Sequence, residues 1–403
     1  MNEHFIINLL LILSSAWAFG ALLNRLGLPS VLGGLVVGFI LGPPLMNILT
    51  PSPHLDFLAE LGVFFIMYYI GLEMDPKELL DHLLPSVLVA IGGFIFSFTL
   101  GFFAAKLMGA TVFQSLFIGL ILSVTAIAVQ AAILQNMQIH KTVVGHVIIG
   151  AALFDDIISL ICLSVLLSLA KGGEVHLAGI IIILMKVSAF FIFSIMIGHF
   201  VIPLITKRLD DFEGKGFTFA IISALVMAYI AEQAGLHLII GAFLAGQFVR
   251  KEIIDEKILK VIKERFYGLS FGFLLPIFFT TLAFHVKLEW NFQFLMFTLT
   301  LIAVAFIGKF VGCGLGAKMS GLGKFESLII GIGMNGRGAV ELVVIGIVIK
   351  LSGDLLAEGQ ILQPLLSEGQ VSSLILMVFI TTLISPILLK WLLLKSPYHN
   401  EQL

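Results

Sequence analysis

The sequence has few charged residues and almost no cysteine. Only 12% of its 403 residues are Asp, Glu, Lys or Arg, whereas 59% are hydrophobic. Soluble domains carry about 25% charged residues, so we expect most of this chain to lie in lipid. The two cysteines, Cys162 and Cys313, fall inside apolar runs without metal-ligand spacing, which predicts that both are packing residues.

An excess of basic charge is also missing, since the sequence has 23 Lys and Arg residues and 25 Asp and Glu residues. This balance offers no positive field for nucleic acid. The sequence contains no phosphate-binding loop, nucleophile elbow or metal-ligand cluster. We therefore expect neither an ATP-driven pump nor a membrane hydrolase, and we expect no cofactor.

Long apolar runs are abundant, and each is of a length that can cross a hydrocarbon core about 30 Å thick. We predict an all-α membrane protein with thirteen transmembrane helices. The predicted spans are 5–24, 28–49, 57–72, 83–108, 112–134, 143–169, 177–206, 216–233, 236–250, 266–284, 292–318, 325–349 and 370–394.

Basic residues set the predicted orientation. With the N-terminus outside, sixteen Lys and Arg residues fall in cytoplasmic segments and four fall outside. Because cytoplasmic loops are enriched in Lys and Arg, this asymmetry predicts an outside N-terminus and a cytoplasmic C-terminus. The segment from Arg250 to Arg265 mixes acids and bases with helical apolar spacing, which predicts an amphipathic linker on the cytoplasmic face.

The chain also contains an internal repeat. A shift of 212 residues aligns 94–119 with 306–331 without a gap, and 11 of the 26 positions are identical. The aligned spans are seven crossings apart, so they run in opposite directions and form two inverted-topology repeats. The alternative is that two glycine-rich helices resemble each other by composition alone. Carriers with inverted repeats place their substrate site near the membrane midplane, beside interrupted helices.

Two stretches are candidates for such interruptions, 121–126 and 333–338, because small and polar residues gather at the centres of their spans. Unwinding there frees backbone groups and opposes the charged ends of half-helices. We expect the hydroxyl groups of Ser123 and Thr125 to serve as ligands, and Asn335 to support the second break.

Two adjacent acids, Asp155 and Asp156, lie at the centre of the sixth span. One carboxylate at the bilayer centre costs roughly 2.5 to 3.5 kcal/mol, so a pair requires a wet cavity or a counter-charge. Adjacent side chains on a helix point about 100° apart, which suggests two separate tasks. Lys309, in the eleventh span, is the expected counter-ion of one acid. The other is free to bind either a dehydrated Na+ or K+ ion or a proton, and this competition is in itself an antiport mechanism.

Two further pairs of charged residues each have two interpretations. Arg337 and Glu341 lie four residues apart on the twelfth span, where side chains meet on one helix face. They either form a salt bridge that braces a broken helix or take a direct part in ion passage. Glu73 and Asp75 close the third span, and we expect them to be solvated helix ends, with cation attraction as the alternative.

These residues resemble the monovalent cation/proton antiporter-2 family, which includes NapA-type, GerN-type and Kef-type carriers. The resemblance rests on the acid pair, Lys309 and the stretches 240–246 and 333–342. It implies that Asp156 binds Na+ or K+ and that Asp155 pairs with Lys309. It also implies a homodimer with two crossed discontinuous helices of the NhaA/NapA-like fold, in which a core transport domain moves like an elevator against a dimerisation domain.

We assign the dimerisation part to residues 1–56 and 177–265, and the ion-translocating core to 57–176 and 266–403. Kef-type carriers have glutamine before the aspartate and a cytoplasmic nucleotide-binding domain. This chain has Asp155 at that position, and we expect no such domain in it.

The sequence therefore predicts a secondary cation/proton antiporter of the cell inner membrane, which acts on Na+ and possibly on K+ and moves net charge. Membrane lipids are expected partners and nucleic acid is not. Two alternatives stay open: an electroneutral Kef-like K+/H+ exchanger, and a Na+-coupled symporter of an organic anion.

Overall fold

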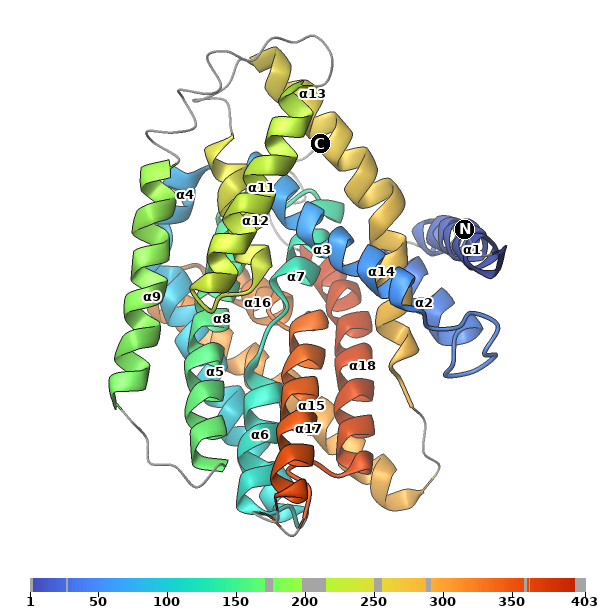
Figure 1. Ribbon diagram of the computed structural model, residues 1–403, viewed down its shortest axis with the longest axis vertical. Coiled ribbons are helices and arrows are strands. Elements are labelled where there is room, and N and C mark those ends of the chain that lie inside the picture. The colour runs from blue at the N-terminus through green and yellow to red at the C-terminus, as the bar shows by residue number, and fades with distance from the viewer. Residues whose placement is uncertain are drawn as a thin grey trace.

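The computed structural model describes residues 3–26, 28–170, 177–197, 215–249, 256–287, 291–358, 361 and 363–395, and their regular structure is helical throughout (Figure 1). The helices are α1 (Glu3–Arg25), α2 (Leu32–Leu41), α3 (Pro53–Glu73), α4 (Pro76–Asp81), α5 (Leu83–Leu107), α6 (Val112–Ser123), α7 (Ile127–Asn136), α8 (Val143–Ala170), α9 (Leu177–Met196), α11 (Lys215–Gln233), α12 (Leu238–Phe248), α13 (Glu256–Tyr267), η3 (Gly268–Leu274), α14 (Leu275–Phe284), α15 (Phe292–Met319), α16 (Lys324–Gly333), α17 (Ala339–Ala357) and α18 (Glu368–Leu393).

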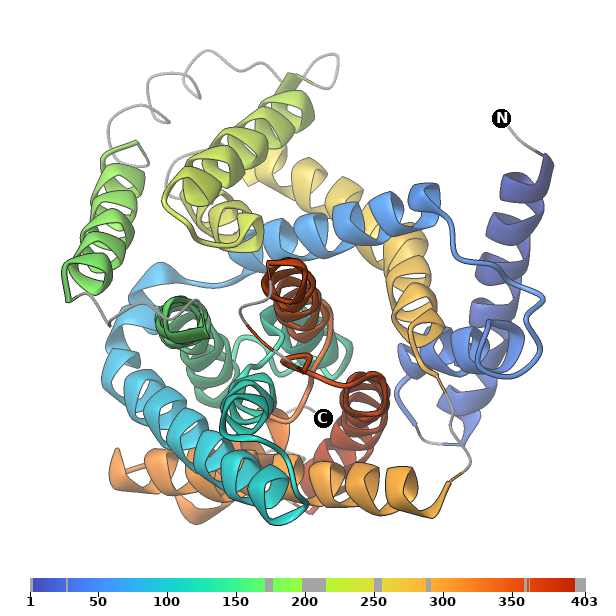
Figure 2. The same ribbon diagram turned by 60° about the horizontal axis from the view of Figure 1, so that its bottom comes forward.

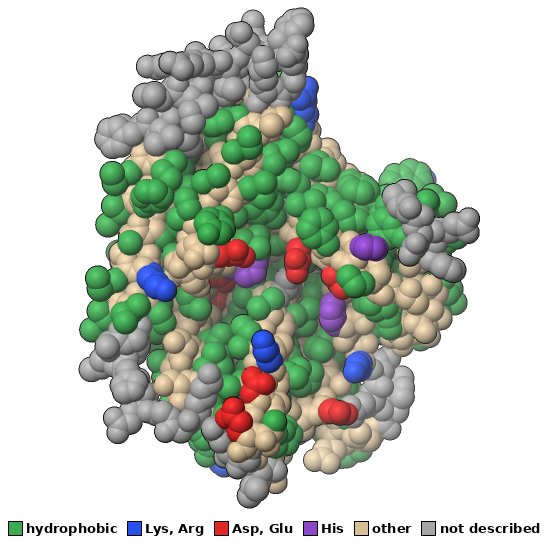
Figure 3. Space-filling model, in the orientation of Figure 1, with side chains coloured by type: hydrophobic (Ala, Val, Ile, Leu, Met, Phe, Trp, Pro, Cys, Tyr) green, Lys and Arg blue, Asp and Glu red, His purple; other side chains and the backbone are tan. Residues whose placement is uncertain are grey.

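Nine helical segments within the described residues are long and apolar enough to cross a membrane. Large apolar side chains such as Leu10, Trp17 and Met185 are exposed on α1 and α9, as expected for helices that face lipid. Figure 3 shows that apolar side chains cover most of one face and that its acidic side chains gather near the middle. The predicted all-helical membrane protein is thereby confirmed. Residues 198–206 of the seventh predicted span and 250–255 of the amphipathic segment lie outside the described residues.

Two helices are interrupted partway along their length. The helical segment of residues 112–136 is broken at Val124–Ala126, between α6 and α7. The segment of residues 324–357 is broken at Met334–Gly338, between α16 and α17. Each interruption leaves the unpaired carbonyl groups of one helix end and the unpaired N–H groups of the next helix start inside the protein.

The helices pack in two groups. One group contains α5, α6, α8, α15, α16 and α18, and the other contains α1, α2, α3, α11, α12 and α14. In Figure 2 the first group lies below α3 in the view, while α1 and α9 lie at opposite edges. Glycines bring helices of each group into backbone contact: a Cβ on Gly92 of α5 would collide with Gly312 of α15, and one on Gly71 of α3 with Phe243 of α12.

Candidate functional site

A fully buried ion pair joins α8 to α15. Lys309 Nζ lies 2.9 Å from Asp155 Oδ2, and both side chains are 0% exposed. Gly93 on α5 lies against the same part of α15, where a Cβ would collide with Cys313 Sγ, one helical turn from Lys309. The structure thus brings together the two residues that the sequence predicts as partners. Buried charges of this kind are tolerated only when each compensates the other.

Asp156, one residue further along α8, points elsewhere. Both of its carboxylate oxygens are buried and accept no hydrogen bond. The residue lines a cavity of about 250 Å³ between α8, α17 and the turn from α11 to α12. The cavity walls are mostly apolar, and their other polar side chains are Ser159, Glu232 and His237. Since Glu232 is exposed, the cavity connects the molecular surface to the buried Asp156.

Arg337, in the second helix break, binds the end of the first broken helix. Its guanidinium donates hydrogen bonds to the carbonyl oxygens of Leu122 at 2.7 Å and Val124 at 2.9 Å, with longer contacts to Ile121 and Ala305. The carbonyls of Leu122 and Val124 lack helical partners because α6 ends at Ser123. The helix end also carries partial negative charge, which the buried guanidinium compensates.

Glu341 caps the opposite kind of helix end. Its Oε2 accepts a hydrogen bond from the Gly338 N–H at 2.8 Å, at the start of α17. Its Oε1 lies 3.9 Å from Arg337 Nη1. The predicted pair therefore exists as a long contact, and the shorter bonds of both residues go to the ends of broken helices.

The two breaks also contact each other and α18. Gln130 donates to the Gly336 carbonyl at 3.1 Å, and the Thr382 hydroxyl donates to the Arg337 carbonyl at 2.7 Å. Ser385 donates to the carbonyl of Ile332 at 3.0 Å. Sequence reasoning missed these three side chains. For Thr382 and Ser385 the signal was present, because hydroxyl groups interrupt the apolar run of α18 near its centre.

The residues near the breaks that the sequence singles out differ in their hydrogen bonds. Thr125 lies in the first break, and its buried hydroxyl makes no hydrogen bond. Ser123 donates to the Leu120 carbonyl at 2.6 Å, a bond within its own helix. Asn335 donates to the Gly331 carbonyl at 2.8 Å, and its side-chain oxygen is buried without a partner. Thr125 and Asn335 therefore each retain an unpaired oxygen, whereas Ser123 points its proton back along α6.

Glu73 is not the solvated helix end that the sequence predicts. Its side chain is 10% exposed and forms ion pairs with Lys141, in the loop after α7, and with Lys263 on α13 at 2.9 Å. The His140 ring lies 3.8 Å away. The prediction was wrong because the partners come from segments that are distant in sequence. This cluster joins the end of α3 to the turn before α8, and so links the two packing groups.

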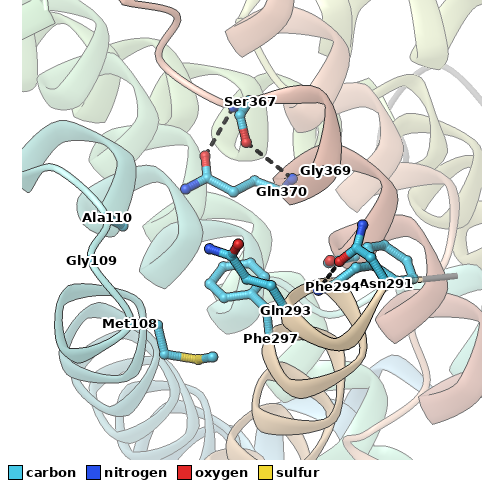
Figure 4. Close-up of a pocket in the computed structure, with 11 residues that line it drawn as sticks. Met108, Gly109, Ala110, Asn291, Gln293, Phe294, Phe297, Ser367, Gly369 and Gln370 are labelled. Carbon is cyan, nitrogen blue, oxygen red and sulfur yellow. Dashed lines mark hydrogen bonds between the residues drawn. The ribbon is translucent and has the colours of Figure 1, made fainter. Parts of the chain in front are cut away.

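A second hollow, about 340 Å³ in volume, lies where the end of α5 meets the starts of α15 and α18 (Figure 4). Figure 4 shows Asn291, Gln293 and Gln370 around it, and the Ser367–Gln370 hydrogen bonds that begin α18. All the side chains that line it are neutral. It therefore lacks the acidic side chains that line the Asp156 cavity.

Transition-metal chemistry finds no support in the part of the chain that the structure describes. A search of those residues finds no group of three or more His, Cys, Asp and Glu side chains that can hold a metal ion. The buried oxygens around the breaks instead suit a hard monovalent cation or a proton.

Comparison with known proteins assigns the family. The model for the transmembrane sodium/hydrogen exchangers matches residues 9–395. The chain belongs to this family. The protein is therefore a transporter and not an enzyme. The chain is 32% identical over 393 residues to the Na(+)/H(+)-K(+) antiporter GerN of Bacillus cereus, with 97% of each chain covered. It is 27% identical to a Na(+)/H(+) antiporter of Enterococcus hirae, with 94% of each chain covered.

Its fold is also that of the sodium proton antiporter MjNhaP1 from Methanocaldococcus jannaschii. The TM-score is 0.77 at 19% identity, and the match covers 98% of this chain and 99% of the other. The resemblance to cation/proton antiporters stated from the residues is thus confirmed at the level of family and fold.

Proposed function

We propose that this protein exchanges Na+, with K+ as a second substrate, for protons at Asp156. The observation that carries the proposal is the charge balance around the helix breaks. Three buried carboxylates, Asp155, Asp156 and Glu341, stand against two buried cationic side chains, Lys309 and Arg337. One negative charge is left over, and either one monovalent cation or one proton neutralises it. An uncompensated charge in a low-dielectric interior is costly, so the site holds one or the other.

Competition for the same carboxylate supplies the coupling. Asp156 holds a cation in one conformation and releases it when a proton takes its place. The electrogenic exchange of two protons per cation that we propose requires a second group to give up a proton during the cycle. The Asp155–Lys309 pair is the nearest candidate, because its two members contact each other beside Asp156.

We further propose thirteen crossings arranged as two inverted-topology repeats, with the N-terminus outside and the C-terminus in the cytoplasm. The support is the distribution of Lys and Arg in the sequence. In this orientation the turn between α11 and α12 lies on the outer side, so the cavity gives Asp156 access from outside. The Glu73 cluster then lies on the cytoplasmic side.

Elevator-type movement in a homodimer of the inner membrane is part of the same proposal. We place the moving core at α5–α8 and α15–α18, because these helices pack on one another. The sequence-based division also put residues 57–82 and 266–284 in the core. However, α3 packs against α12 and α14 packs against α2, so we assign both to the dimerisation part.

The choice of ion follows from the relatives. GerN of Bacillus cereus is described as a Na(+)/H(+)-K(+) antiporter and the Enterococcus hirae protein as a Na(+)/H(+) antiporter. We therefore propose Na+ as the main substrate, with K+ as a second. An organic anion is disfavoured as a substrate, because the cavity carries the carboxylates of Asp156 and Glu232.

The decisive test is proton flux in proteoliposomes to which each alkali cation is added in turn. We expect Na+ to release protons from wild-type vesicles, and Asp156→Asn to abolish the response because an amide cannot exchange a proton for a cation. Current on a solid-supported membrane separates electrogenic from electroneutral exchange. Cation-driven proton flux that survives Asp156→Asn contradicts the proposal.

A further inference from the structure

Only one of the two carboxylate oxygens of Glu341 is needed for its structural role. Its side chain is fully buried, and Oε2 caps α17 by accepting the Gly338 N–H. Capping of a helix start requires only one oxygen. The other oxygen, Oε1, accepts no hydrogen bond although it is buried. A buried oxygen without a partner is uncommon in proteins and requires a reason.

The surroundings of Glu341 point to an ion. Its closest cationic group, Arg337 Nη1, is 3.9 Å from Oε1 and donates instead to the carbonyls at the end of α6. Asp156 lines one cavity together with Val340 and Val344, which lie on either side of Glu341 in α17, and neither Asp156 oxygen is bonded. Two neighbouring buried carboxylates repel each other unless a cation or a proton lies between them.

We propose that Glu341 is a second ligand of the transported cation. Its Oε1 binds the ion opposite Asp156 while its Oε2 remains on α17. This inference rests on the proposed function and adds a binding residue to it. Through Glu341, α17 contacts the ion directly, so binding of the ion changes the charge at the start of that helix.

The substitution Glu341→Gln tests this inference, because the amide oxygen of glutamine can still accept the Gly338 N–H while the charge is lost. We expect the Na+ concentration for half-maximal flux to rise at least about tenfold, a change of about 1.4 kcal/mol. Stabilisation of the purified protein by Na+ should weaken in parallel. The unfolding temperature without Na+ should stay at its wild-type value.

Asp354→Asn provides the matched control, since Asp354 is an exposed acid on the same helix. It should leave the half-maximal Na+ concentration unchanged. A Glu341→Gln protein with wild-type Na+ dependence overturns the inference and leaves Glu341 as a helix cap. If Asp156→Asn abolishes flux in the same experiments, the proposed function stands even when this inference fails.

Should Glu341→Gln not fold, the wild-type protein itself gives the answer through hydrogen exchange. A ligand role predicts that Na+ slows exchange of the backbone amides of residues 336–342, relative to a choline control. Equal exchange rates in Na+ and choline overturn the inference.

Discussion

At the scale of single residues, the site is defined by which buried oxygens have partners and which do not. Asp155 is bound to Lys309 through one oxygen, whereas Asp156 has two free oxygens. The two acids are neighbours in sequence, and the helix turn alone separates their environments. One acid is therefore paired with a protein side chain, and the other has no partner within the protein.

The Asp155–Lys309 pair yields a prediction about stability. Lys309→Gln leaves Asp155 buried without a counter-charge, and breaking such a pair costs about 3–5 kcal/mol. We expect a marked fall in the unfolding temperature of the purified protein in detergent. Adding Asp155→Asn should recover most of the loss, because both groups are then neutral. A double variant no more stable than Lys309→Gln would show that the charge is compensated in another way.

At the scale of helices, the breaks are stabilised across the sequence. Arg337 binds carbonyls more than 200 positions earlier in the chain, and α18 supplies hydroxyl groups to the second break. Two half-helices, one full helix and one guanidinium therefore meet at the breaks. Movement of any one of them changes the position of the others.

The Glu73 cluster yields a prediction about the contact between the two packing groups. Partly exposed ion pairs contribute about 0.2–1 kcal/mol each. Loss of the pairs to Lys141 and Lys263 should therefore shift the equilibrium between the conformations with an open and a closed Asp156 cavity about 2- to 30-fold. We expect Glu73→Gln to favour the conformation in which the Asp156 cavity is closed. The measurement is the labelling rate of a cysteine placed at Val343, which lines that cavity.

Glu60→Gln serves as the control for this experiment, because Glu60 is an exposed acid on the same helix, α3. It should leave the labelling rate unchanged. An equal rate in the Glu73→Gln and wild-type backgrounds would mean that the cluster does not hold the two groups in the conformation described here.

At the scale of the whole molecule, the proposed orientation predicts which side of the membrane reaches the cavity. In a background with Cys162→Ser, Val343→Cys should react with a membrane-impermeant thiol reagent added from outside. Leu80→Cys, on exposed α4, should react only from the cytoplasmic side. The opposite labelling pattern would show that the orientation is the reverse of the proposed one and that the cavity opens to the cytoplasmic side.

Much of this architecture is predictable from the sequence. Charges inside long apolar runs identify Asp155, Asp156 and Lys309, because such residues are costly in lipid unless they have a role. Glycine and polar residues at the centres of two spans indicate the regions where the helices break.

Other features are not predictable because they depend on which distant segments meet. The bonds from Arg337 to the end of α6, the support from Thr382, and the pairing of Glu73 all join residues far apart in the chain. Apolar periodicity locates each helix but not its neighbours. For the same reason, the sequence-based boundary of the core part differs from the packing of α3 and α14.

The hydrogen bonds from Arg337 to the end of α6 also connect the two halves of the chain. A side chain from the second half of the chain is bonded to backbone carbonyls of the first half where the two helix breaks meet. The Lys309–Asp155 ion pair and the bond from Gln130 to the Gly336 carbonyl join the same two halves. A displacement of one half at the breaks is therefore transmitted to the other through several polar links rather than through apolar contacts alone.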